Sequence, residues 1–111
     1  MSSCDPSLTC WYVYLIENRL GHWYCGVTTN IERRFAEHCA DGPLTAKALK
    51  GKGPLRLVHV VTTLNKRTAL QLEYWVKRQS KAGKRAWVTD SARCPFAHHV
   101  YTGMKFPYIL R

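Results

Sequence analysis

Residues 11–28 carry the sequence WYVYLIENRLGHWYCGVT, which decides the fold. Aromatic and β-branched residues dominate both ends of this stretch, and such residues favour strands. We therefore predict one strand over Trp11–Glu17 and a second over His22–Thr28. The segment between them, Asn18–Gly21, is short and contains a turn-forming glycine, so the two strands should form an antiparallel hairpin.

Signals for helices and a third strand follow the hairpin. We predict a helix over Ile31–Cys39, a third strand over Arg56–Thr62, and a long helix over Lys66–Lys81 that Gly83 ends. Within residues 44–55 we expect one helical turn around Ala46–Leu49, followed by a loop built from Gly51, Gly53 and Pro54. The order β-β-α-β-α predicts an α/β (α+β) domain with a small three-stranded antiparallel sheet flanked by helices.

The length of 111 residues fits one domain. We expect residues 1–10 to be a flexible leader and residues 11–88 to form the domain. Residues 89–111, which are rich in aromatic side chains, would be a C-terminal tail that packs on the domain or on a protein partner.

The charge of the chain is strongly positive. Seventeen Lys and Arg against seven Asp and Glu give a net charge of +10, and between Leu44 and Arg85 there is one acidic residue, Glu73. Such an excess favours a polyanionic partner, with nucleic acid ahead of a membrane surface. The chain shows no signal peptide and no apolar run long enough to span a membrane, so we expect an intracellular protein. Five cysteines without a CxxC pair argue against a disulfide framework.

Two tyrosines on the hairpin are the first candidates for a functional site. Tyr14 and Tyr24 lie on paired strands, and Gly26 removes side-chain bulk beside one of them. The two tyrosines and the glycine could form a shallow polar surface that a backbone or a phosphate can approach closely. The competing interpretation is ordinary cross-strand packing of aromatic residues.

The helix predicted over residues 31–39 adds two more candidates. Ile31, Phe35 and Cys39 form its apolar stripe, and Arg34 and His38 lie together along one edge of that stripe. An arginine at the boundary of the core offers a planar set of donors for phosphate oxygens. The alternative is that Arg34 only covers apolar surface with its aliphatic stem.

Glu73 is the fifth candidate. Ala69, Leu72 and Val76 mark the inward side of the long helix, and Glu73 falls within the apolar arc. A carboxylate there needs a partner. Lys77, four residues later, is one partner, and a hard divalent cation is the other.

Together these residues resemble the GIY-YIG nuclease domain. The match consists of Tyr14, Tyr24-Cys25-Gly26, Arg34, His38 and Glu73, and covers roughly residues 11–88. The chain is most similar to the small stand-alone bacterial branch and to the nuclease part of the eukaryotic structure-selective endonucleases. It departs from the family pattern at two packing positions, since Tyr12-Val13-Tyr14 lacks the leading glycine and Cys25 replaces the usual Ile or Val.

The resemblance implies metal-dependent hydrolysis of a phosphodiester. By position, Glu73 would hold one divalent metal, Mg²⁺ or Mn²⁺, and Arg34 would bind the scissile phosphate. Tyr14 and Tyr24 would orient the attacking water, and which of them acts as general base stays open; His38 would assist. The basic side chains that would follow the nucleic-acid backbone are Lys47, Lys50, Lys52, Lys77, Arg78 and Lys81.

The resulting hypothesis is an endonuclease acting on DNA, structure-selective or non-specific, in repair or recombination. RNA stays open as a substrate. A non-catalytic nucleic-acid-binding module that kept the fold is the main alternative, and a protein-interaction or membrane-surface domain is a third.

Overall fold

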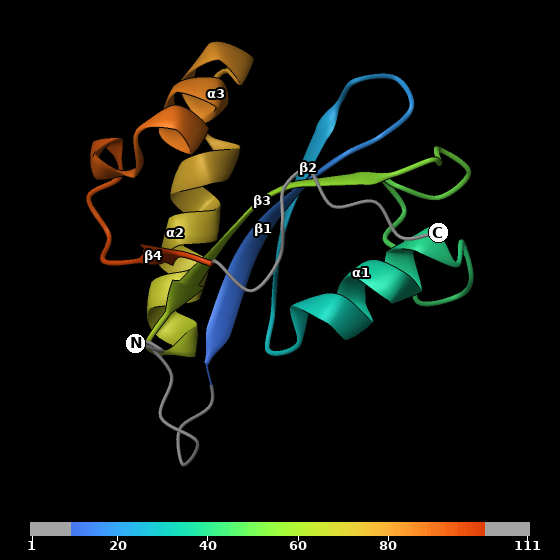
Figure 1. Ribbon diagram of the computed structural model, residues 1–111, viewed down its shortest axis with the longest axis horizontal. Helices are drawn as coiled ribbons and strands as arrows, with labels where there is room; N and C mark the ends of the chain where they lie inside the picture. The colour runs from blue at the N-terminus through green and yellow to red at the C-terminus, as the bar shows by residue number, and fades with distance from the viewer. Residues whose placement is uncertain (1–9, 102–111) are drawn as a thin grey trace.

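A computed structural model of the chain describes residues 10–101 and is shown as a ribbon in Figure 1. The elements begin in the predicted order β-β-α-β-α and continue beyond it. They are β1 (Trp11–Glu17), β2 (Trp23–Thr28), α1 (Ile31–Cys39), β3 (Arg56–Thr63), α2 (Lys66–Lys77), α3 (Lys81–Thr89), the short 3₁₀ helix η1 (Ser91–Arg93) and β4 (His99–Val100).

The sheet has four antiparallel strands in the order β2-β1-β3-β4. The expectation of three strands was one short, because β4 spans only two residues and pairs Val100 with Val61 and His99 with Thr62. So short a strand carries too little periodicity to stand out in a sequence. β1 lies at the centre, and β2 forms one edge.

Helices cover both faces of the sheet. α1 packs on one face, and α2 and α3 pack on the other (Figure 1). Alternate residues of β1 serve the two cores: Val13 and Leu15 contact the α2 side, whereas Tyr14 and Ile16 contact the α1 side. The hairpin is therefore shared by two separate cores, and β1 contributes Tyr14 and Ile16 to the core on the α1 face.

The long helix predicted over 66–81 is in fact two helices. α2 ends at Lys77, and α3 starts after Ser80, whose side chain accepts from the backbone N–H of Gly83 and so caps the new helix. Gly83 lies inside α3 and does not end α2. A Cβ at this position would approach the Cβ of Gln79 to 3.2 Å, so the glycine allows the tight junction between the two helices.

The described part of the C-terminal segment packs on the domain. Trp87 of α3 is fully buried, and its indole Nε1 donates to Nε2 of His98 at 3.2 Å. The Tyr101 ring meets the Tyr12 ring edge to face at 5.3 Å. The predicted leader (but for Cys10) and residues 102–111 of the predicted tail lie outside the described residues.

The cysteines differ in state. Cys10 is disulfide-bonded, contrary to the expectation from the cysteine count, whereas Cys25, Cys39 and Cys94 are free thiols.

Over residues 10–101, no helix is both long and apolar enough to cross a membrane.

Candidate active site

Tyr14 and Gly26 face each other across the hairpin, and their pairing shapes the site. The strand register places them directly opposite. A Cβ on Gly26 would lie 2.4 Å from the phenol oxygen of Tyr14 and 2.6 Å from Cζ. The space that Gly26 leaves is therefore filled by the Tyr14 ring and is not an open approach for phosphate or for another backbone. Only glycine at position 26 lets this ring lie flat across β2.

His38 of α1 contacts Tyr14 on the α1 face of the sheet. It belongs to the buried face of α1 together with Ile31 and Phe35, at the i, i+4, i+7 spacing of an amphipathic helix. Its Nε2 lies 2.9 Å from the phenol oxygen of Tyr14, and both side chains are 1% exposed. The Tyr24 ring lies edge-on to His38 at 5.7 Å. Three rings from β1, β2 and α1 thus converge on one point.

The hydrogen bonds of His38 show which of its two ring nitrogens carries the proton. The backbone N–H of Ala46 donates to Nδ1 at 3.3 Å, so Nδ1 is the acceptor. Burial, followed by the nearby Arg34 guanidinium, lowers the pKa of His38 to about 4, so the ring is neutral at pH 7. A neutral imidazole carries one N–H. That proton is on Nε2, and His38 donates it to the phenol oxygen of Tyr14.

The environment of Tyr14 keeps the free phenol protonated. Burial raises the pKa of Tyr14 well above its usual range, and the neighbouring Tyr24 raises it further. The Arg34 guanidinium opposes both effects and lowers it. Additional positive charge near this oxygen, such as a cation bound with substrate, would shift the phenol toward its ionised form.

Arg34 is fixed from two sides. Its Nη1 donates to the Glu37 carboxylate at 3.0 Å and to the carbonyl of Leu44 at 2.7 Å. Glu37 also lies near Arg33, but that contact is longer, at 3.9 Å. A guanidinium has five N–H donors, so these contacts leave others for a phosphate. We call Tyr14, Tyr24, Arg34 and His38 the α1-face cluster.

Glu73 lies apart from the α1-face cluster. It projects from α2, which covers the opposite face of the sheet, and its carboxylate pairs with Lys77 Nζ at 3.3 Å. Its charge raises the pKa of the Cys25 thiol on β2, after the larger effect of burial, so Glu73 lies close to the edge strand. In the described part of the chain, no hydrogen bond or ion pair joins Glu73 to the cluster. Glu73 and the cluster therefore lie on opposite faces of the sheet.

One carboxylate is compatible with a divalent metal that substrate helps to hold. The Glu73 side chain is 19% exposed and offers hard oxygen donors. Mg²⁺ commonly takes one or two carboxylates and completes its shell with waters and phosphate oxygens. No group of three or more His, Cys, Asp and Glu side chains lies together within residues 10–101, so an all-protein cage is absent there.

The predicted backbone-binding side chains form two separate groups. Lys47 and Lys50 are exposed on the loop beside α1, with Lys52 half-buried, and the others lie at the end of α2 and the start of α3. Lys81 is exposed, but its ammonium already donates a hydrogen bond to the carbonyl of Gly21 in the β1–β2 turn. On the other side of this turn, the Arg19 backbone N–H donates to the Lys52 carbonyl at 2.8 Å.

Sequence reasoning missed the loop that supports the cluster. Leu44 and Ala46 act through their backbones, which no side-chain motif reveals. Thr45 donates its hydroxyl to the carbonyl of Glu37 at 2.9 Å and ties the loop to α1. Only the contact between Arg34 and Glu37 had a signal in the sequence, because residues three apart on a helix lie side by side.

The comparison with protein families agrees with the geometry. The model of the GIY-YIG catalytic domain matches residues 10–86. The chain therefore belongs to the GIY-YIG family, whose domain has a nuclease-type fold.

Within that family, the chain is similar to UPF0213 proteins. It is 46% identical to one from Vibrio campbellii over 74% of this chain and 77% of the relative. It is 45% identical to one from Yersinia pestis over 75% and 85%. A UPF0213 protein from Bacillus halodurans, solved by solution NMR, is 38% identical over 72% of this chain and 83% of that one, with a TM-score of 0.48.

Proposed function

We propose that this protein is a divalent-metal-dependent endonuclease that hydrolyses phosphodiester bonds in DNA. The observation that carries the proposal is the buried hydrogen bond from neutral His38 to the phenol oxygen of Tyr14, beside the guanidinium of Arg34. A donor aimed at a phenol oxygen, next to a fixed positive charge, stabilises a phenolate and an adjacent phosphate. A simple binding module has no need for either.

The two tyrosines would have different roles. Tyr14 is 1% exposed, whereas Tyr24 is half-buried and lies nearer to solvent. We therefore place the attacking water at Tyr24. Tyr14 would hold His38. Positive charge added to the site would favour release of the Tyr14 hydroxyl proton to solvent, and the resulting phenolate could then accept a proton from the attacking water. Since His38 donates to Tyr14, the hydroxyl hydrogen of Tyr14 is left to point toward another acceptor.

Arg34 would bind the scissile phosphate. Its contacts to Glu37 and Leu44 fix the guanidinium plane before substrate arrives, so little reorganisation is needed when charge builds up in the transition state. Glu73 would hold the metal, which polarises the phosphoryl oxygen and the leaving oxygen when it is bound. The phosphate chain would reach both groups by crossing the edge of β2.

Substrate choice would depend on shape more than on sequence. Lys47, Lys50, Lys77 and Arg78 are exposed and can contact phosphates, and such contacts position a nucleic acid without distinguishing bases. We therefore expect weak sequence preference, with flaps, branches or single strands as preferred substrates and repair or recombination as the setting.

The test is cleavage of labelled single-stranded, duplex, flap and branched DNA in Mg²⁺, Mn²⁺ or EDTA. Glu73→Gln should abolish cleavage while leaving the fold intact. Glu32→Gln, the same chemical change at an exposed position on α1, is the matched control and should cut normally. Metal-independent cutting, or full activity in Glu73→Gln, would contradict the proposal. Tight binding without cutting under either metal would favour the non-catalytic module.

A further inference from the structure

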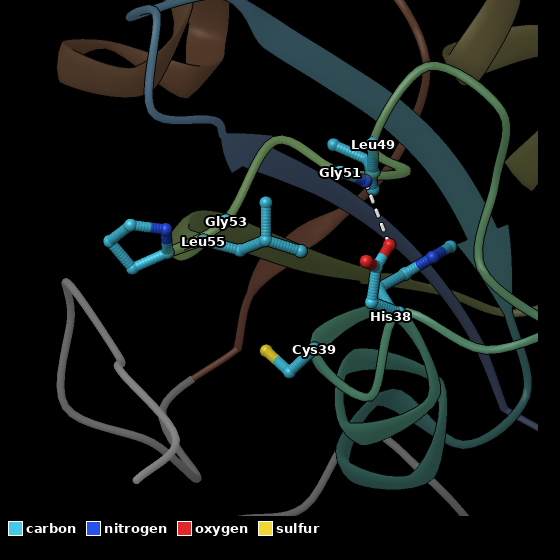
Figure 2. Close-up of a pocket in the computed structure, with 8 residues that line it drawn as sticks. His38, Cys39, Leu49, Gly51, Gly53 and Leu55 are labelled. Carbon is cyan, nitrogen blue, oxygen red and sulfur yellow. Dashed lines mark hydrogen bonds between the residues drawn. The ribbon is translucent and has the colours of Figure 1, made fainter.

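A pocket of about 430 Å³ opens between the C-terminal end of α1 and the loop that leads to β3 (Figure 2). His38 belongs both to this pocket and to the α1-face cluster, so the two sites share a wall. The lining residues are His38, Cys39, Asp41, Leu49, Gly51, Gly53, Pro54 and Leu55.

The loop that forms the far wall is held in place by Asp41. The Asp41 carboxylate accepts from the backbone N–H of Gly51 at 2.8 Å, the dashed contact in Figure 2. Gly51 has φ +70°, a conformation that favours glycine. A Cβ added at Gly51 or Gly53 would meet nothing within 4 Å, so both residues border open space. The opening is therefore a fixed feature of the loop and not a gap left by poor packing.

The lining suits a group that combines apolar surface with N–H donors. Leu49, Leu55 and Pro54 supply apolar surface. The Asp41 carboxylate supplies an acceptor, and the C-terminal end of α1 carries partial negative charge. A phosphate would be repelled from this interior, but Lys47 and Lys50 are exposed on the same loop and can hold a phosphate outside it.

We propose that this pocket receives an unpaired nucleobase of the substrate, adjacent to the phosphate bound by Arg34. The proposal rests on the proposed function and names the feature that would select among substrates. An already unpaired base avoids the cost of unstacking. Ends, flaps and frayed junctions would therefore be preferred to intact duplex.

Cys39 provides a direct readout of pocket occupancy. Its thiol lines the pocket, whereas the other free thiols among residues 10–101, Cys25 and Cys94, are buried. Because burial raises the pKa of the Cys39 thiol, modification by N-ethylmaleimide is followed at mildly alkaline pH by peptide mass spectrometry. EDTA is present throughout to prevent cleavage.

The probes are a duplex with a single-stranded overhang and the same molecule with abasic nucleotides in the overhang. The two have equal charge and differ only in the bases. We expect the first to slow Cys39 modification at least fivefold and the second to leave it nearly unchanged, at concentrations where fluorescence anisotropy shows both bound. Equal protection by both probes, or protection by neither, would overturn the pocket assignment. Failure of both to bind, in EDTA and also when Ca²⁺ replaces EDTA as the divalent cation, would overturn the proposed function itself.

A pair of variants gives a second test. Gly53 lines the pocket, and a Cβ added there would meet nothing within 4 Å, so Gly53→Leu should add bulk at the pocket wall. Ala48→Leu introduces the same side chain at an exposed position that does not line the pocket. Gly53→Leu should reduce the preference for the overhang over the abasic probe to about onefold, whereas Ala48→Leu should keep it. An unchanged preference in a folded Gly53→Leu protein would contradict the proposal.

Discussion

Replacing Gly26 by alanine should displace Tyr14 and disable the site. The new Cβ would lie 2.4 Å from the phenol oxygen, whereas ordinary contact begins at 3.4 Å, so the ring must move by about 1 Å. The bond to His38 is 2.9 Å long, and hydrogen bonds of this kind end near ~3.2 Å, so the displacement breaks it.

The expected magnitudes follow from these distances. Overpacking a core costs about 1–3 kcal/mol, and the lost hydrogen bond adds about 1 kcal/mol. For a domain of this size each kcal/mol lowers Tm by about 4–8 °C, so a fall of roughly 10 °C or more is expected. A misplacement of about 1 Å can lower the rate about 100-fold.

The assay pairs thermal unfolding with metal-dependent cleavage, and Gly42→Ala is the control because its Cβ would meet nothing within 4 Å. Tyr14→Leu combined with Gly26→Ala should recover part of the stability without recovering cleavage. If Gly26→Ala matched Gly42→Ala in both Tm and cleavage, the argument that Gly26 positions Tyr14 would be refuted.

Three further predictions concern titration and charge. Burial, and after it the nearby His98, lowers the pKa of His59 in the folded protein to about 4. In the unfolded chain this histidine takes up a proton already near pH ~6.5. The free energy of unfolding should therefore fall as the pH drops from about 6.5 to about 4. His59→Phe, which keeps an aromatic ring beside Trp87, should reduce this dependence in thermal melts and leave the part that His38 contributes; an unchanged slope would count against it. The pKa of His38 is likewise about 4, so cleavage should show no titration of this residue between pH 5.5 and 8, although His38→Ala should abolish cleavage. Lys50→Ala should lower the salt dependence of DNA binding by about one phosphate contact, or ~0.7–0.9 in the log–log slope, and Lys81→Ala by less because its ammonium is already held.

The elements with strong periodicity were predictable from the sequence. β1 and α1 have the predicted bounds, since the run of aromatic and β-branched residues in β1 and the Asn30 cap of α1 specify them locally. The division between α2 and α3 was missed because Gly83 looks like a helix end when the capping role of Ser80 is not known. Leu70 of α2 is 42% exposed, so apolar side chains on this helix extend beyond the arc that the sheet covers.

The candidate site was only partly predictable, for a similar reason. Helical spacing gives the direction of Arg34 and His38 relative to their own helix, and the structure brings both to Tyr14. The same spacing for Glu73 says nothing about which face of the sheet α2 covers. That depends on the crossing from β3 to α2, which the side-chain pattern does not encode. Contacts made by loop backbones, such as Ala46 to His38, are equally invisible.

The β1–β2 turn has a consequence for how the protein can be modified. Leu20 at its tip is 57% exposed, which would ordinarily mark a tolerant place to insert a tag or to cut and rejoin the chain. Here the turn is bonded to the loop before β3 on one side and to α3 on the other. An inserted peptide would loosen attachments on both faces of the sheet at once. Despite its exposure, this tip is a poor site for a fusion or a circular permutation.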